Sequence, residues 1–325
     1  MQTYRHSGAM SLPGIPITIA AGLLTAGVLG FVYSYAVVYI PLIYINVLLT
    51  FGFGFAIGAA VAWGANVGKI RNNFMAGAYG LAFGCAGLYV AWAADLLARA
   101  GVPFCIEVFY PSVLWDYMQF FYENGFWAVG HGGGGNVNGV FLGAVWAIEA
   151  AIIVVTATWV AHSAIASRPF CEPCNRWTTA EEGVSRLSLH GAEENALNRL
   201  LAGELAALGQ MNRATANEAS YLRLDLATCS RCADSNFLTI QLVQHTVNKK
   251  GEPQVETKPL LTNLIVDAAN VPLVREAGRE PKPDLPEEFA EPPSATEADA
   301  SQADGETPPF LEFLDDREEE KRPGK

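Results

Sequence analysis

The chain has 325 residues, of which 51% are hydrophobic and 17% charged, and its formal net charge is -12. This balance is unusual for a single soluble globule, and the length allows two domains. The charges also divide the chain: residues 13–68 and 74–94 contain none, whereas charged residues are frequent after Arg168. The sequence therefore predicts a lipid-embedded half followed by a water-exposed half.

Four apolar stretches in the first half are long enough to span a bilayer core, which takes about 20 residues. They run over Ile17–Tyr39, Ile43–Gly64, Phe74–Leu96 and Gly139–His162, with a tight hairpin near Pro41 between the first two. Soluble proteins rarely contain four buried helices of this length, and the first stretch is longer than the roughly 7–15 residue core of a cleavable signal peptide. We predict an N-terminal segment over residues 1–16 and an all-α bundle of four transmembrane helices over 17–163.

Basic residues mark one side of the predicted membrane domain. They lie before the first span, between the second and third, and after the fourth: Arg5, Lys69, Arg71 and Arg168. The aromatic connection 99–138 carries Glu107, Asp116 and Glu123, with no Lys or Arg after Arg99. Because basic residues concentrate in cytoplasmic loops, we predict a multi-pass protein of a cell inner membrane, in contact with membrane lipid. Its N- and C-termini are then cytoplasmic, and the connection 99–138 is extracytoplasmic.

An amphipathic helix is expected within this connection, from Pro111 to Glu123. Its apolar face consists of Leu114, Tyr117, Met118 and Phe121. Such a helix is typical of segments that lie on a membrane surface. A lid over a cavity between the spans is the alternative.

Small residues recur at the spacing of helix contacts. The pairs are Gly54/Gly58, Gly64/Gly68, Gly80/Gly84 and Gly139/Gly143. This pattern favours close packing of the helices rather than a pore. Aromatic residues near the span ends, such as Tyr33, Tyr35, Tyr39 and Tyr44, are expected at the membrane interface.

Glu149 is an ionisable residue inside the fourth predicted span. It lies on one stripe of that helix with Asn138, Thr156 and Ser163. A charge at this depth costs about 3 kcal/mol, so the carboxyl group must be protonated or face a polar partner. Candidate partners are Asn46, Asn66, Thr25 or a second subunit of a homo-oligomer. One hypothesis is a small transporter or channel subunit that uses Glu149 to handle protons or cations. The other is a neutral acid hydrogen-bonded between helices.

Two Cys-x-x-Cys pairs follow the last span: Cys171 with Cys174, and Cys229 with Cys232. Four thiolates complete a tetrahedral zinc site, and this closed shell indicates one structural ion per chain rather than a catalytic one. An iron–sulfur cluster is an alternative for four cysteines. A redox pair is the third reading, although stable disulfides are disfavoured in the cytoplasm.

The residues around the cysteines predict a small α+β domain over 168–270. Thr179 and Glu182 suggest a helix cap, and apolar residues from Leu197 onward keep a helical spacing to Gly209. Alternating leucines before and after the second cysteine pair predict two strands, and Leu260–Val266 a third after a turn at 249–252. With its Cys-Glu-Pro-Cys and Cys-Ser-Arg-Cys knuckles, the chain resembles the zinc-ribbon family over about residues 168–266. The helical insertion between the knuckles departs from that family.

The last segment, 271–325, contains 7 Lys/Arg and 16 Asp/Glu, a balance of -9, and many prolines. It is predicted to be a disordered acidic tail. Basic residues in 168–270 form no stripe, so no nucleic acid is expected and a cytoplasmic protein partner is favoured. No catalytic set is evident. The sequence therefore favours a membrane protein that anchors a cytoplasmic zinc-stabilised protein-interaction domain.

Overall fold

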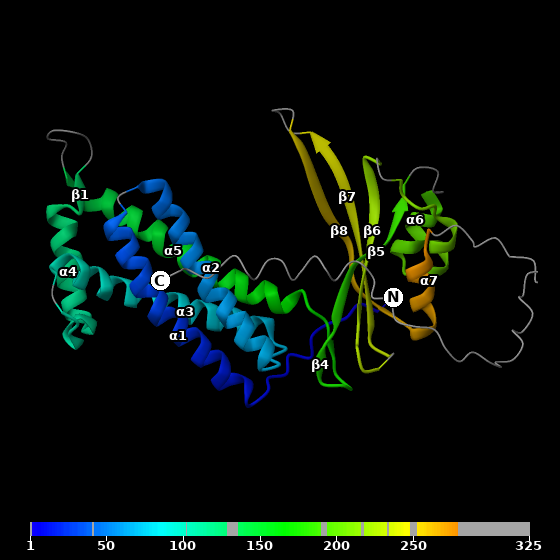
Figure 1. The fold of residues 1–325 in the computed structure, drawn as a ribbon, viewed down its shortest axis with the longest axis horizontal. Coiled ribbons are helices and arrows are strands. Elements are labelled where there is room, and N and C mark those ends of the chain that lie inside the picture. The colour runs from blue at the N-terminus through cyan, green and yellow to red at the C-terminus, as the bar shows by residue number, and fades with distance from the viewer. Residues whose placement is uncertain are drawn as a thin grey trace, which may run out of the picture. The chain divides into compact units, whose positions relative to one another are not determined.

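A computed structural model describes residues 2–40, 42–101, 103–128, 136–189, 194–215, 218–232, 234–247 and 252–278. It contains a helical region at the N-terminus followed by a small strand-rich region (Figure 1). The predicted hairpin at Pro41, most of the predicted turn at 249–252 and the predicted tail from residue 279 onward lie outside the described residues.

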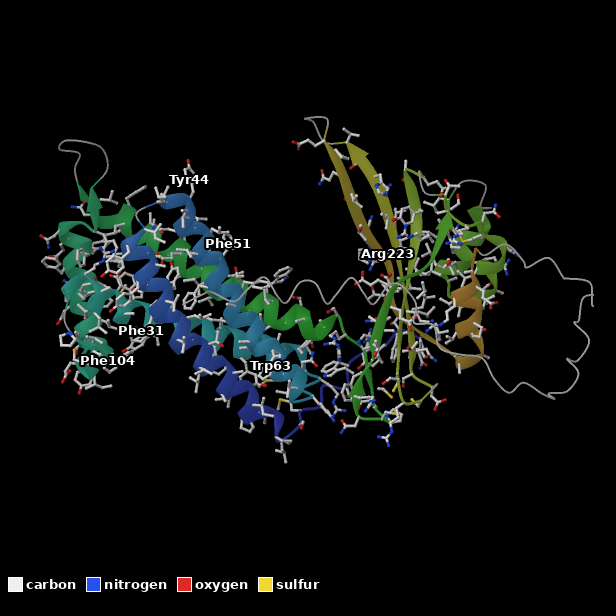
Figure 2. All side chains as sticks on the ribbon, in the orientation of Figure 1. Phe31, Tyr44, Phe51, Trp63, Phe104 and Arg223 are labelled. Atoms are coloured by element: carbon white, nitrogen blue, oxygen red, sulfur yellow. The ribbon has the colours of Figure 1, made fainter. Side chains whose placement is uncertain are left out.

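The helical region contains four helices that, among the described residues, are long and apolar enough to cross a membrane. They are α1 (Gly14–Tyr39), α2 (Ile43–Val67), α3 (Asn73–Ala100) and α5 (Gly139–Ala166). Each covers one predicted span, so the expectation of four such helices is confirmed. Many large apolar side chains point outward from them, including Tyr44, Phe51 and Trp63 (Figure 2). Exposed apolar surface of this extent is typical of proteins that contact lipid.

Close contacts between the helices occur at the predicted glycines. α5 packs against α2 and α3, and α1 packs against the same two helices. A Cβ atom at Gly58 or Gly80 would lie 2.7 or 2.6 Å from the carbonyl oxygen of Ala157, so only glycine permits this approach. The prediction fails for the fourth pair: Gly139 has no neighbour within 4 Å of such an atom, and Gly143 meets only the ring of Tyr122.

The connection between α3 and α5 contains the short 3-10 helix η1 (Ile106–Phe109) and the helix α4 (Pro111–Asn124). A two-residue strand pair, β1 (Trp127–Ala128) with β2 (Asn136–Val137), precedes α5. In α4, Leu114 is buried while Asp116 is exposed. The predicted amphipathic helix is therefore present.

The strand-rich region is an antiparallel sheet in the order β5-β6-β7-β8. Its strands are β5 (Thr179–Ser188), β6 (Ser220–Thr228), β7 (Asn236–Val247) and β8 (Pro253–Val266). The alternating leucines predicted to form β6 and β7 do so, and Leu222, Leu224, Leu226 and Leu238 are fully buried. Short helices complete the core of the sheet: α6 (Glu194–Leu201), η2 (Leu205–Gln210) and α7 (Val271–Glu276). The 3-10 turn η3 (Ala268–Asn270) connects β8 to α7 and has no buried residue.

The strand-rich region differs from the sequence-based expectation in one element and in one boundary. The predicted helix cap at Thr179 and Glu182 was wrong, because these residues belong to β5, which pairs along β6. Gly183 adopts a positive φ of 63° at an irregularity in this pairing, and its N–H donates to Asp225. The sheet region also extends beyond residue 270, because Val274 in α7 is fully buried in the core.

Candidate metal centre

The first cysteine pair lies on a tight hairpin directly after α5. Strand β3 (Phe170–Cys171) pairs with β4 (Arg176–Trp177), and the intervening turn contains Cys174. Asn175 has a φ of 51°, a left-handed conformation that asparagine tolerates better than most residues. Its N–H donates to the carbonyl of Glu172, which closes the turn. The turn therefore places the two thiols on the same side of the hairpin.

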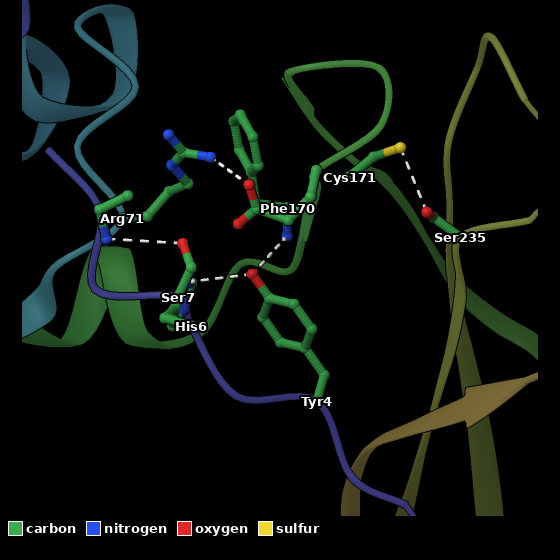
Figure 3. A network of polar contacts seen from close by, with 9 residues as sticks. Tyr4, His6, Ser7, Arg71, Phe170, Cys171 and Ser235 are labelled. Carbon is green, nitrogen blue, oxygen red and sulfur yellow. Dashed lines mark hydrogen bonds and ion pairs between the residues drawn. The ribbon is translucent and has the colours of Figure 1, made fainter. Parts of the chain in front are cut away.

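The second cysteine pair lies in the connection between β6 and β7. Thr228 and Asn236 are the last paired residues of the two strands, and Cys229 follows directly. Its N–H donates to the carbonyl of Ser235, and the Ser235 hydroxyl donates to Cys171 Sγ at 3.2 Å. This last contact connects the two knuckles directly (Figure 3).

The four sulfur atoms form one compact group although 54 residues separate the two pairs in the chain. All four Sγ atoms lie within 4.8 Å of one another. Cys171 and Cys229 are buried, and Cys174 and Cys232 are partly exposed. A single tetrahedral ion with Zn–S bonds of about 2.3 Å would set its ligands about 3.8 Å apart. The 3.6 Å between the sulfurs of Cys171 and Cys232 fits this spacing, so the group could hold one metal ion.

The surroundings of the thiols shift their pKa values in opposite directions. A hydrogen bond to Cys232 raises the pKa of Cys174 to about 12. Burial raises the pKa of Cys171 as well. Burial also acts to raise the pKa of Cys229, but hydrogen bonds from the backbone N–H groups of Arg231 and Cys232 outweigh it and lower that pKa to about 6. Hydrogen bonding thus favours the thiolate form of Cys229, which is the form that binds metals.

The first knuckle is attached to the ends of the membrane-type helices. Arg71, in the connection between α2 and α3, forms an ion pair with Glu172, and its guanidinium group lies 4.7 Å from the centre of the Phe170 ring. The indole N–H of Trp177 donates to the carbonyl of Asn66 at 2.8 Å. The hydroxyl of Tyr4 accepts a hydrogen bond from the N–H of Phe170 (Figure 3). The cysteine group thus lies beside a network joining three separate segments of the chain.

An open recess of about 530 Å³ lies beside the knuckles. Its lining includes Cys174 and three basic residues: Lys69, Arg176 and Arg231. None of the three forms an ion pair with an acidic residue in the described ranges. No basic stripe is visible in the sequence because these residues come from three distant segments.

The predicted polar stripe on α5 is not one connected site. Asn138 donates to the carbonyl of Glu123, Ser163 donates to the carbonyl of Trp159, and Thr156 packs at Gly54. Glu149 instead accepts a hydrogen bond from Tyr33 of α1. Tyr33 was expected at the membrane interface, but it is only 7% exposed because it packs on Phe53 and bonds Glu149.

Among the described residues, the hydrogen-bond partner of Glu149 is Tyr33, and no hydrogen bond joins Glu149 to the predicted partners Asn46, Asn66 or Thr25. A tyrosine was not considered because aromatic residues near span ends are usually interfacial. Asp95 of α3, near the end of the third predicted span, was missed as well. It accepts hydrogen bonds from Arg99 and from the hydroxyl of Tyr117.

No family model, curated protein or solved structure matches this chain. Two features of the chain itself therefore bear on its function. Four helices are long and apolar enough to cross a membrane, and four clustered cysteines could hold a metal ion.

Proposed function

We propose that this chain is a multi-pass inner-membrane protein that anchors a cytoplasmic, zinc-stabilised domain for binding another protein. The observation that carries the proposal is the convergence of four thiols from two knuckles to within 4.8 Å. A group of this kind is a structural centre, because four thiolates leave no coordination position for a substrate or water.

The spacing of the sulfurs favours a single ion over an iron–sulfur cluster. A cluster places several irons and sulfides between its cysteines, so its ligands stand farther apart than those of one ion. Zinc is the common ion for closed four-thiolate sites. Each cysteine pair lies in the connection between two antiparallel strands, which supports the resemblance to zinc ribbons.

The distribution of basic residues supports the proposed cytoplasmic location of this domain. Lys69 and Arg71 connect α2 and α3, and Arg168 follows α5, so the basic residues lie at the helix ends nearest the knuckles. Basic residues at one set of helix ends indicate the cytoplasmic side. A reducing compartment would also keep the cysteines available as thiolates.

The basic recess beside the knuckles is the surface on which we place the partner. Arg176 and Arg231 are both exposed, so both can contact a ligand. Arg176 also donates to the Ser230 hydroxyl at 3.0 Å. Three cations without acidic partners in the described part of the chain favour an acidic protein segment. Zinc would support this surface indirectly, because it holds Cys174 and Cys232 and therefore both sides of the recess.

Metal analysis of the purified full-length protein is the first test. We expect one zinc per chain, and loss of metal together with unfolding of the sheet region when a strong chelator is added. Metal-free protein that remains folded and readily forms a disulfide would contradict the proposal and favour redox chemistry.

Photo-cross-linking in intact membranes tests the partner surface. A cross-linker at position 230 should capture a protein, and Arg231→Glu should reduce this capture at least tenfold. Arg213→Glu is the matched control, because Arg213 is exposed but lies outside the recess. Equal capture by both variants would exclude the recess as the binding surface.

A further inference from the structure

A small cavity lies inside the helical region, remote in sequence from the cysteines. Its volume is about 50 Å³. Its polar lining consists of Tyr33, Ser34, Asp95 and Glu149, contributed by α1, α3 and α5. The aromatic part of its lining consists of Trp92, Phe126 and Trp146. A water molecule needs about 10–15 Å³ of such volume, so the cavity has room for one small ion with a few waters but not for a large organic molecule.

The charges around this cavity are not balanced. The Asp95 carboxylate is compensated by Arg99, whose Nε lies 2.9 Å from Oδ2. Glu149 accepts a hydrogen bond from Tyr33, but no ion pair joins it to a basic residue within the described ranges. An ionised carboxylate at this depth requires a compensating charge. The cavity therefore lacks one positive charge whenever Glu149 is ionised.

Ser34 provides a second, independent indication of a ligand. Its residue is 3% exposed and lines the cavity, and its hydroxyl oxygen has no hydrogen-bond partner among the described residues. Buried hydroxyl groups nearly always have a partner, which is often a water or an ion. The Ser34 oxygen is thus available to a small ligand in the same cavity as Glu149.

A chain of hydrogen bonds can accommodate both protonation states of Glu149. Only the hydroxyl hydrogens of the chain need to reorient. Tyr33 lies between Glu149 and Thr50, with 3.0 Å separating its hydroxyl from that of Thr50. Thr50 in turn lies 2.8 Å from the carbonyl oxygen of Asn46. With Glu149 ionised, Thr50 donates to Tyr33 and Tyr33 donates to Glu149. With Glu149 protonated, each bond reverses: Glu149 donates to Tyr33, Tyr33 donates to Thr50, and Thr50 donates to the Asn46 carbonyl.

We propose that this cavity binds one monovalent inorganic cation of the sodium type in exchange for the proton of Glu149. Oxygen ligands are available from Glu149, Ser34 and Tyr33, and hard cations prefer oxygen. A single charge fits, because a divalent ion would leave an excess positive charge in a buried site. Cation entry and release of the Glu149 proton leave the net charge of the cavity unchanged.

Tryptophan fluorescence provides a direct assay, because Trp92 and Trp146 line the cavity. The full-length protein in detergent micelles is titrated with NaCl, with N-methylglucamine chloride replacing it at constant ionic strength. We expect a saturable change with Na⁺ that N-methylglucamine does not cause. The apparent Kd should rise up to tenfold for each pH unit below the pKa of Glu149, because the proton competes for the same oxygen atoms.

Three variants and one measurement on the unmodified protein decide the outcome. Glu149→Gln, a neutral side chain of the same shape, should abolish the Na⁺ response, and Ser34→Ala should weaken binding severalfold. The exposed Glu107→Gln is the control and should respond like the unmodified protein. Addition of Na⁺ to unmodified protein in weak buffer should release up to one proton per chain.

The proposal is overturned if Na⁺, K⁺ and Li⁺ change the fluorescence no more than N-methylglucamine does. It is also overturned if folded Glu149→Gln protein keeps the response. Should that variant not fold, the absence of proton release from the unmodified protein would refute the proposal by itself. None of these readouts depends on the cysteine group, so they are independent of the proposed zinc-stabilised domain.

Discussion

The substitution Gly58→Ala tests whether the glycines set the distance between the helices. The added methyl group would lie 2.7 Å from the Ala157 carbonyl oxygen and 2.8 Å from Cβ of Val160. Nonbonded carbon contacts are optimal at roughly 3.5 Å or more, so α2 and α5 would have to separate by roughly 0.8 Å. Overpacking of this kind costs about 1–3 kcal/mol.

Gly52→Ala is a matched control in the same helix, because a Cβ atom there has no neighbour within 4 Å. Alanine is favoured over glycine in a helix by about 1 kcal/mol at either position, so this contribution cancels between the two variants. We therefore expect Gly58→Ala to be about 2 kcal/mol less stable than Gly52→Ala.

Unfolding in mixed micelles with increasing dodecyl sulfate, followed by circular dichroism, would measure this difference. Gly80→Ala approaches the same Ala157 carbonyl oxygen, at 2.6 Å, and should be destabilised similarly. Equal stability of the Gly58 and Gly52 variants would refute the close approach of α2 to α5.

Three further predictions concern the region around the cysteines. Cys174→Ser should lower the metal content and the melting temperature of the sheet region, whereas Cys85→Ser, an exposed cysteine in α3, should change neither; elemental analysis and thermal melts check this. Burial lowers the pKa of His6 from its ordinary value of about 6.5, and its Nε2 is buried without a partner in the described residues. The neutral form of His6 is thus favoured in the folded state, and its contribution to stability is present above pH 6.5 and lost as the pH falls toward the folded-state pKa. His6→Gln should therefore reduce the change in melting temperature between pH 7 and 5. Asn175→Ala should cost about 1 kcal/mol in denaturant unfolding, and Asn175→Gly less, because its positive φ strains alanine; equal losses would contradict this.

Two hydrophobic patterns in the sequence, the long apolar runs and the alternating leucines, predicted secondary structure correctly without a structure. Apolar runs of membrane length predicted α1, α2, α3 and α5, since burial in lipid requires apolar residues on every side of a helix. The alternating leucines predicted β6 and β7, since only one face of this sheet is covered. The Cys-x-x-Cys spacing predicted a metal-binding group for a local reason: each short turn aims two thiols in one direction.

Local signals failed where long-range contacts decide the conformation. Thr179 and Glu182 resemble a helix cap, but this segment pairs along β6, and the pairing overrides its local preference. The short helix α7 was assigned to the acidic tail because its proline and charged residues resemble the composition of residues 279–325, whereas Val274 completes the core of the sheet.

The sequence by itself determined the number of apolar helices, the two central strands and the two Cys-x-x-Cys pairs, because each depends on residues close together in the chain. Only the tertiary structure decided which residues meet. It brought Tyr33 to Glu149 across 116 positions, placed Lys69 beside two arginines of the knuckles, and left Ser34 without a partner among the described residues in a shared cavity. The physical reason is that such contacts depend on how the helices and strands pack, and packing is set by the fit of whole surfaces rather than by any local pattern.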